Sequence, residues 1–209
     1  MLLSILLSTN PPTPPPDAAS NQDAAALIEK LAKPIPSSTS YTEVRFAHQL
    51  RRPIVLQGRL DYGGADKLGK RVESPYIETT EIADGHVTVQ REGRGKREFA
   101  LDRAPQLQAL LTGFSAMLGG DPNTLKKFFS VRLDATPGQW ILTLSPLQSS
   151  LSRHLHAIIV DGSADEPHCF SLVESDGDAS VMLLGPLAST KLPTPPTRAA
   201  LSAICHAKS

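Results

Sequence analysis

The sequence lacks the features that mark several large classes of protein. Its 21 basic residues are matched by 21 acidic ones, so net charge gives no reason to expect binding to nucleic acid or an anionic membrane surface. Only 5% of the 209 residues are aromatic, which leaves few side chains on which bases could stack. No apolar run approaches the roughly 20 residues of a membrane-spanning helix. The 40% hydrophobic content still predicts a folded chain, which we expect to be a monomer without a nucleic-acid partner.

Cysteine is scarce as well, since the chain has only Cys169 and Cys205. In an oxidising compartment the two could pair, but two thiols do not make a disulfide framework. Cys169 falls in a strand-like run and Cys205 in a tail. The simpler interpretation is therefore that Cys169 is a buried thiol and Cys205 a loose, unpaired one. Both interpretations stay open, because disulfide geometry is strict.

The two ends of the chain differ in amino-acid composition from the rest. The apolar run MLLSILL at Met1–Leu7 is followed by PPTPPP, and we interpret residues 1–17 as a signal remnant or a disordered Pro-rich leader. Residues 191–209 form a Pro-rich tail that contains a short helical stretch from Thr197 to His206. One domain is expected between them, over residues 18–190.

Apolar and polar residues alternate with a period of two through most of this domain. This pattern predicts antiparallel strands separated by turns such as Asp84-Gly85 and Asp176-Gly177. In one of them Leu56, Gly58 and Leu60 share an apolar face. The strands are expected at Tyr41–Leu50, Ile54–Tyr62, Leu68–Glu73, Tyr76–Ile82, His86–Arg91, Arg97–Leu101, Phe129–Leu133, Gln139–Leu144, His154–Val160, His168–Glu174 and Ala179–Leu184.

Helical periodicity appears in two places. A short helix is predicted over Ala24–Leu31, capped by Ser20 or Asn21 and ended by Pro34. A longer insert runs from Ala104 to Phe128 and contains a strongly amphipathic helix that ends at Gly119-Gly120. Its apolar residues are Leu107, Leu110, Leu111, Phe114, Met117 and Leu118, and Asp121 then caps a second short helix with Pro122 at its first position.

These elements predict a mainly β protein with some α-helix. A single sheet of about eleven strands has to curl or split. If it curls without closing, its concave apolar face needs a cover, and the two helical segments are available for that. We therefore expect an open antiparallel β half-barrel covered by helical lid segments.

The order of these elements resembles the outer-membrane lipoprotein carrier family of the LolA type, over roughly Ser20 to Pro186. It is more specifically similar to a divergent branch associated with biosynthesis of aryl-polyene or xanthomonadin-type pigments. The resemblance rests on a capping helix, a strand pair around Phe46 and Gly58, turns at Pro75 and Asp84-Gly85, the helical insert, the run Trp140–Leu144 with Pro146, and the strand Ile158–Gly162.

Membership would imply a periplasmic carrier from a Gram-negative bacterium. Such a carrier takes the acyl chains of a lipoprotein, or another lipidic cargo, from an inner-membrane transporter and passes them to an outer-membrane acceptor. The cavity and lid would be lined by Phe46, Leu60, Tyr62, Leu107, Leu110, Leu111, Phe114, Met117, Leu118, Phe128, Trp140, Leu142 and Leu144. The same residues would also suit a closed core, because pockets and cores share their chemistry.

One position departs from the family. Gly64 stands where the type carriers have an arginine that ties the lid to the sheet, and Lys67 or Arg71 is a nearby replacement. The resemblance therefore favours lipid-like cargo in general over lipoprotein. A sensing or assembly subunit that binds lipid or peptide with the same half-barrel is the alternative function.

Arrangements that carry chemistry are sparse. His154 and His156 share one face of a strand, and His168 follows later, but no cysteine or carboxylate falls at metal-ligand spacing, so we interpret His154 and His156 as a surface pair. The serines of 149–152 are expected in a loop and lack the Gly-x-Ser-x-Gly elbow of hydrolases, and 176–178 is typical of a hairpin turn. We expect no catalytic residue, metal or cofactor, and no enzymatic activity.

Overall fold

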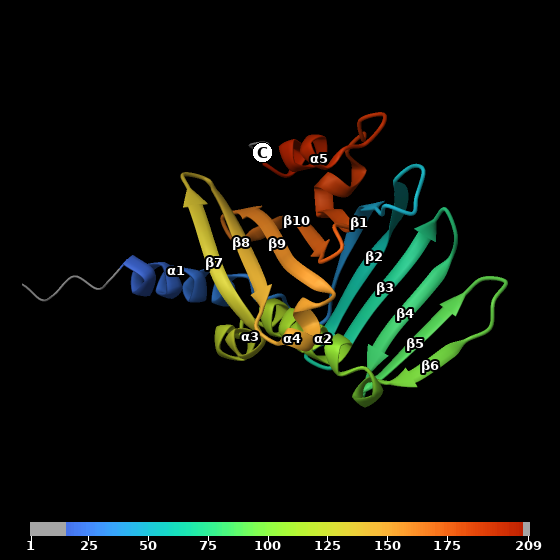
Figure 1. The fold of residues 1–209 in the computed structure, drawn as a ribbon, viewed down its shortest axis with the longest axis horizontal. Coiled ribbons are helices and arrows are strands. Elements are labelled where there is room, and N and C mark those ends of the chain that lie inside the picture. Colours follow the sequence, from blue (N-terminus) through green and yellow to red (C-terminus); the bar gives the residue numbers. More distant parts are fainter. Residues whose placement is uncertain (1–15, 207–209) are drawn as a thin grey trace, which may run out of the picture.

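An open sheet of 11 antiparallel strands dominates the computed structural model, which describes residues 16–206 (Figure 1). Hydrogen-bonded neighbours follow the order β6-β5-β4-β3-β2-β1-β11-β10-β9-β8-β7, and β6 does not pair with β7 in this part of the chain. The strands are β1 (Ser37–Phe46), β2 (Ile54–Gly64), β3 (Lys67–Ser74), β4 (Glu78–Ala83), β5 (His86–Arg91), β6 (Arg97–Ala100), β7 (Phe129–Thr136), β8 (Gln139–Pro146), β9 (Leu155–Ser163), β10 (Glu166–Glu174) and β11 (Ala179–Leu184). The predicted open half-barrel is therefore confirmed.

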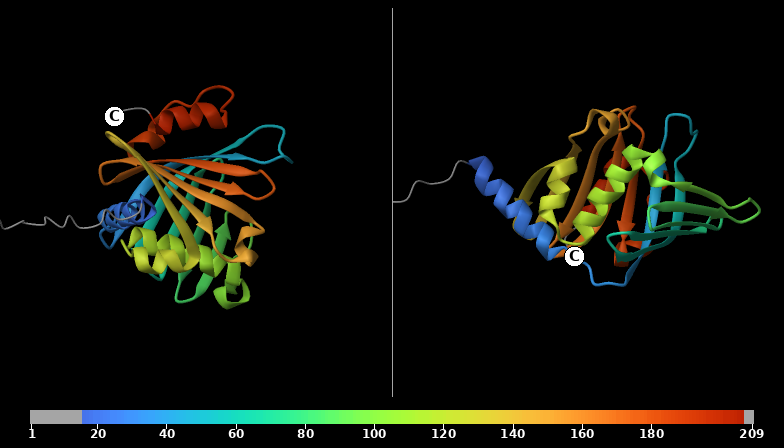
Figure 2. Two further views of the ribbon diagram at one scale, coloured as in Figure 1. Left: turned by 60° about the vertical axis from the view of Figure 1, so that its left-hand side comes forward. Right: turned by 90° about the horizontal axis from the view of Figure 1, so that it is seen from below.

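The mid-chain insert lies on the concave side because of the strand order. β6 and β7 follow each other in sequence yet form the opposite edges of the sheet, so the chain between them has to cross it. It does so as a 3-10 helix η1 (Leu101–Arg103) and two helices, α2 (Pro105–Leu118) and α3 (Pro122–Phe128). Figure 2 shows these helices on one side of the sheet and the C-terminal helix on the other.

Helices fill the concave side over β7, β8 and β9. There α1 (Pro16–Lys30) and α4 (Ser149–Ser152) join α2 and α3 in one hydrophobic core with these strands. Ile28 of α1, Leu125 of α3 and Leu142 of β8 are fully buried in it. This half of the sheet therefore has a packed core of the protein's own side chains.

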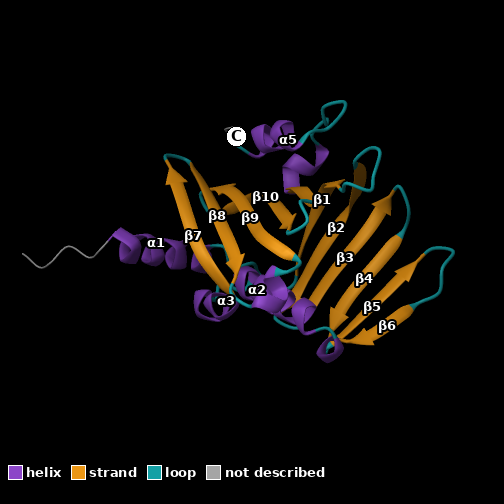
Figure 3. Cartoon of the chain, in the orientation of Figure 1, coloured by secondary structure: helices purple, strands orange, loops and turns teal. Residues whose placement is uncertain are grey.

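The other half of the sheet reaches beyond the helices, as Figure 3 shows for β3 to β6. Cross-strand pairing places Leu68, Ile82 and Val87 on the concave face of β3, β4 and β5. Leu68 and Ile82 are only partly buried, and Phe99 of the edge strand β6, opposite Val87, is 38% exposed. Apolar side chains thus remain accessible on this part of the concave face.

The C-terminal segment packs on the convex face. Leu201 of α5 (Arg198–Cys205) is fully buried against Val44 and Leu183, and Cys205 forms a disulfide with Cys169 of β10. The interpretation of the two cysteines as a buried and a loose thiol was wrong. A short 3-10 helix, η2 (Gly185–Ser189), leads from β11 into this segment.

Several boundaries differ from those expected. Helix α1 begins at Pro16, so neither Ser20 nor Asn21 is its cap, and β1 ends at Phe46 instead of Leu50 because a loop follows it. The serines of 149–152, expected in a loop, form α4. The interpretation of residues 1–17 as a signal remnant or leader lies outside the described residues, except for Pro16 and Asp17, which begin α1. Among those that are described, no helix combines the length and apolar character needed to cross a membrane.

Candidate functional site

Helix α2 is held tightly against the β7 edge of the core. Pro105 stands in its first turn, and the chain leaves the helix at Gly119. Gly113 faces the ring of Phe129, where an added Cβ would lie 2.3 Å from a ring carbon. Only glycine allows this approach. The predicted cap of the next helix is confirmed, since a carboxylate oxygen of Asp121 accepts hydrogen bonds from two backbone N–H groups of α3.

The two long faces of α2 are buried to different degrees. Ala109, Gly113 and Ala116 lie on one face and are buried. The opposite face carries a stripe of large apolar side chains, and each of them is only partly buried. We call this the α2 stripe; it consists of Leu107, Leu111, Phe114 and Leu118.

The α2 stripe faces the middle of the concave sheet. The ring of Phe114 meets that of Phe170 on β10 edge to face, with centroids 5.1 Å apart and an angle of 80° between the planes. Phe170 is the cross-strand partner of Met182 on β11; Met182 belongs to a second apolar cluster on the same face, and Phe170 packs against that cluster. We call this cluster the concave floor; it contains Tyr41, Leu56, Val72 and Met182, with Leu60, Tyr76, Phe170 and Leu184 partly buried around it.

The residues predicted for the cargo site fall into three sets. Met117, Trp140, Leu142 and Leu144 are buried in the helix-covered core, and Phe128 packs against it. A second set lies on or beside the α2 stripe and the concave floor, and contains Leu60, Tyr62, Leu107, Leu110, Leu111, Phe114 and Leu118. In this second set Leu110 and Phe114 also contact the core.

Phe46 forms the third set, because it lies on the other side of the sheet. Side chains alternate along β1, so Tyr41 faces the concave side while Val44 and Phe46 face the convex side. Phe46 packs against the cluster around α5, and the guanidinium carbon of Arg198 lies 5.7 Å from its ring centroid. Its assignment to the cavity lining is corrected by this alternation.

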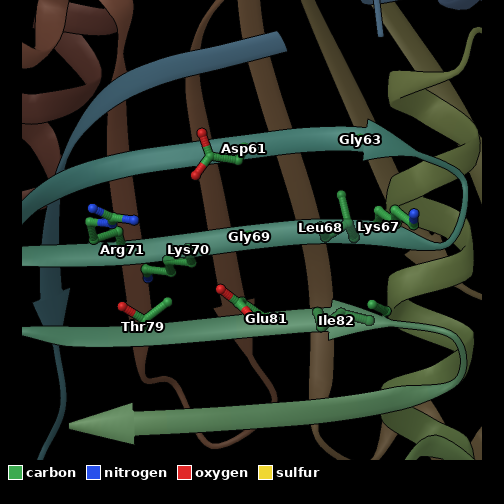
Figure 4. A pocket seen from close by; sticks show the side chains of 11 residues that line it. Asp61, Gly63, Lys67, Leu68, Gly69, Lys70, Arg71, Thr79, Glu81 and Ile82 are labelled. Atoms are coloured by element: carbon green, nitrogen blue, oxygen red, sulfur yellow. The ribbon is translucent and has the colours of Figure 1, made fainter. Parts of the chain in front are cut away.

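Two depressions in the surface lie away from the α2 stripe. One of about 260 Å³ lies mainly on the convex face of β2 to β4, where Gly69 leaves space between Asp61 and Glu81 (Figure 4). The other, of about 340 Å³, lies between the β1–β2 loop and the β10–β11 turn. Most side chains around the first depression are polar or charged, so it does not suit an acyl chain.

A charged cluster on the concave side of β1 and β3 was missed by sequence reasoning. Glu43 accepts hydrogen bonds from Arg45, with Nε to Oε1 at 2.8 Å and Nη2 to Oε2 at 3.3 Å. Lys70 Nζ donates to Oε2 of the same carboxylate at 2.5 Å. The alternation of Tyr41, Glu43 and Arg45 along β1 was the available signal, because it puts all three on one face.

The cluster shifts the pKa values of its members. Burial alone would raise the pKa of Glu43, but the hydrogen bond from Arg45 and the charge of Lys70 outweigh it, so this pKa lies below its ordinary value. Burial lowers the pKa of Lys70 despite its contact with Glu43. Burial and the nearby carboxylate both raise the pKa of the Tyr41 hydroxyl. The site is therefore a partly dry one in which charges interact strongly.

Another polar grouping lies on the surface near the β10–β11 turn. His48, Asp176 and Asp178 each offer a ligand atom, and these atoms lie within 4.8 Å of one another. Asp178 already accepts hydrogen bonds from the backbone N–H of His48 and contacts its Nδ1 at 2.9 Å. The grouping is explained by the turn and by this ion pair. His154 and His156 are exposed, as expected for surface residues.

Residues 16–208 match the family model described as "Outer membrane lipoprotein carrier protein LolA-like". The chain belongs to this family. A solved structure similar to this LolA-like chain is the LolA superfamily protein NE2245 from Nitrosomonas europaea, with 9% identity and a TM-score of 0.46 over 84% of this chain and 96% of that one. LprF from Mycobacterium bovis has 11% identity and a TM-score of 0.36 over 89% of this chain and 100% of that one. The MucA/MucB complex of Pseudomonas aeruginosa gives 15% identity and a TM-score of 0.35 over 78% of this chain and 55% of that one. No curated protein matches the chain.

The predicted family is thereby confirmed for this LolA-like chain. Gly64 has a φ of +117° at the end of β2, a backbone conformation that suits glycine. The suggested replacements, Lys67 and Arg71, line the depression on the convex face (Figure 4), which is the opposite side of the sheet from α2. Lys70 is the cation of β3 that faces the concave side.

Proposed function

We propose that this LolA-like chain is an exported carrier that binds the acyl chain of a lipidic cargo between the α2 stripe and the concave floor. One observation carries the proposal. Large apolar side chains of α2 stay partly exposed although they face an apolar floor. Apolar surfaces that face each other and stay partly exposed are the arrangement a removable hydrophobic guest needs.

The energetics support such a guest. Burying one methylene group stabilises a complex by about 0.8 kcal/mol, so a twelve-carbon chain gains roughly 9 kcal/mol before entropy costs. The contact between Phe114 and Phe170 competes with the cargo for the same surface. Exchange of lid contacts for cargo contacts keeps the net affinity moderate, which a carrier requires in order to release.

The site is smaller than the one predicted from the sequence. Trp140, Leu142 and Leu144 already fill the helix-covered core, so they hold the lid side of the sheet together and do not line the cargo site. The residues that we assign to cargo contact are the partly buried Leu60, Leu107, Leu111, Phe114 and Leu118. Tyr62 is as buried as Trp140 and is therefore left out of this set.

The disulfide between Cys169 and Cys205 supports export, because such bonds persist in oxidising compartments such as the periplasm. Delivery from an inner-membrane transporter to an outer-membrane acceptor stays a prediction, as does the link to a pigment-forming branch of the family. The absence of enzymatic activity likewise stays a prediction. A lipid- or peptide-sensing subunit remains the alternative, and native mass spectrometry of protein from its own host separates the two: a bound lipid supports the carrier, and a stable protein partner without lipid supports the sensor.

The test of acyl binding compares two substitutions on α2. Leu111→Asp places a charge in the α2 stripe and is expected to weaken binding of a fluorescent twelve-carbon probe at least about tenfold, because a buried charge is costly. Thr112→Asp adds the same charge on an exposed position of the same helix and should leave binding unchanged. Equal binding by Leu111→Asp and the unaltered protein, or no binding of any acyl probe, would contradict the proposal.

A further inference from the structure

A tyrosine hydroxyl on the concave floor has a hydrogen bond left to make. Tyr41 is 1% exposed, and its hydroxyl has no hydrogen-bond partner among the described residues. The ring is fixed on both sides: an added Cβ on Gly58 would lie 3.2 Å from one of its carbons, and Lys70 Nζ lies 5.1 Å from its centroid. A buried polar group without a partner costs free energy, so a fixed one points to a ligand.

The charged cluster beside this hydroxyl offers donors and has a surplus positive charge. Arg45 and Lys70 carry two positive charges against the single negative charge of Glu43. Glu78, whose charge also acts on Lys70, stands opposite Arg91 of β5, so this second pair leaves the surplus unchanged. An arginine has five N–H donors and a lysine has three, and Glu43 engages only two and one of them respectively. The side chains of Arg45 and Lys70 are 45% and 26% exposed, whereas that of Glu43 is 5% exposed. The unused donors are therefore accessible and the carboxylate is not.

Stability does not account for this arrangement. Charges that are taken out of water gain little net free energy from pairing. Replacing a buried ion pair by apolar side chains often leaves the stability of a protein unchanged. Glu43 is better understood as a positioning residue, because it holds both cations over the apolar floor. The Tyr41 hydroxyl lies close enough to Glu43 and Arg45 for their charges to influence its ionisation.

We propose that Tyr41, Arg45 and Lys70 bind the anionic head group of an amphiphile, a carboxylate or a phosphate monoester, whose acyl chain lies along the α2 stripe. This inference rests on the function proposed above and specifies the chemical class of its cargo. Anionic oxygens accept charge-assisted hydrogen bonds from all three residue types, and such bonds are about twice as strong as neutral ones.

The distance between the two parts of the site suits one molecule. Phe114 of the α2 stripe contacts Phe170, which stands opposite Met182, and Met182 stands opposite Glu43. Two strand spacings, or about 10 Å, therefore separate the aromatic contact from the charged cluster. An acyl chain attached to the head group can cover this distance along the apolar floor.

The experiment measures binding of three probes to the full chain by calorimetry at pH 7: dodecanoate, dodecan-1-ol and acetate. Dodecanoate is expected to bind about tenfold more tightly than dodecan-1-ol, and acetate far more weakly than either. Lys70→Gln and Tyr41→Phe should each remove most of the preference, so that each variant binds dodecanoate about as tightly as it binds dodecan-1-ol. Lys67→Gln, which removes the same charge from an exposed position of the same strand, should keep the preference.

Each other result has a distinct meaning. If dodecanoate and dodecan-1-ol bind equally, or if both variants at Tyr41 and Lys70 keep the preference, the head-group site is wrong and the acyl-binding function stands. If acetate binds as tightly as dodecanoate, the cluster is a site for free anions and the amphiphile is wrong. If neither amphiphile binds, both proposals fail. Thermal unfolding checks that the variants are folded, which we expect of Tyr41→Phe because it removes an unpaired hydroxyl.

Discussion

Removal of the disulfide is expected to destabilise this LolA-like chain strongly without touching its concave face. The bond joins Cys169 and Cys205 across a sequence separation of 36 residues. Cross-linking a loop of that length lowers the entropy of the unfolded chain by about 13 cal/mol/K, which corresponds to roughly 4 kcal/mol at 25 °C. Both cysteines are buried in the cluster on the convex face, so the bond lies on the opposite side of the sheet from the concave floor.

Urea unfolding of the oxidised and the reduced protein measures the effect. Trp140 is the only tryptophan, and it is 6% exposed in the helix-covered core, so its fluorescence reports unfolding of the sheet. With a slope of about 2 kcal/mol/M, a loss of 4 kcal/mol moves the midpoint down by about 2 M urea. The double variant Cys169→Ser/Cys205→Ser should behave like the reduced protein.

Ser202→Ala serves as the control, because Ser202 is an exposed residue of the same helix α5. It should shift the midpoint by no more than a few tenths of a molar. Binding of an acyl probe should persist in the reduced protein at low urea, since α5 lies on the convex face. A loss of less than about 1 kcal/mol on reduction would refute the view that the unfolded chain gains freedom across this loop.

Two further results are expected. Gly113→Ala should destabilise the protein by about 1–3 kcal/mol in the same urea assay, because the added methyl group would overlap the ring of Phe129; a neutral effect would show that α2 is loosely held. Acid should destabilise the protein through Glu43: burial favours its neutral form, yet the hydrogen bond from Arg45 and neighbouring charge bring the pKa below the ordinary 4.5. Its stabilising contribution is then complete above pH 4.5 and is lost as the pH falls through the lowered pKa. Acid should therefore lower the stability of Glu43→Gln less than that of the unaltered protein. If the stability of both proteins falls equally with pH, Glu43 does not make this contribution.

Local patterns explain why much of the fold was predictable. Alternation along β2 placed Leu56 and Leu60 on one face, and turn signals such as Asp84-Gly85 ended strands within a few residues of the observed positions. These signals act over neighbouring residues, so they do not depend on the tertiary structure. The prediction of a loop at 149–152 was wrong because the helix there is a single short turn, which is held by packing of the buried Leu151 against the core.

Long-range pairing explains what could not be predicted. Cys169 and Cys205 meet because β10 lies beside β11 and the chain then folds back over the convex face, which no local pattern encodes. Glu43 and Lys70 belong to strands separated by β2, so their contact depends on register across three strands. Sequence reasoning interprets charged residues on strands as a wet face, and it therefore misses a buried carboxylate.

Helix α2 combines a local pattern with long-range packing. The helical period identified its apolar residues correctly. It did not identify which face would be packed most closely, because the face of small residues is apolar as well as the α2 stripe. Ala109, Gly113 and Ala116 allow the helix to approach β7 more closely than leucines would, so close packing selects the small face. The α2 stripe is consequently turned toward the concave floor and stays only partly buried. Because the closest packing of α2 uses its small residues, its large apolar side chains are left available for the guest that we propose.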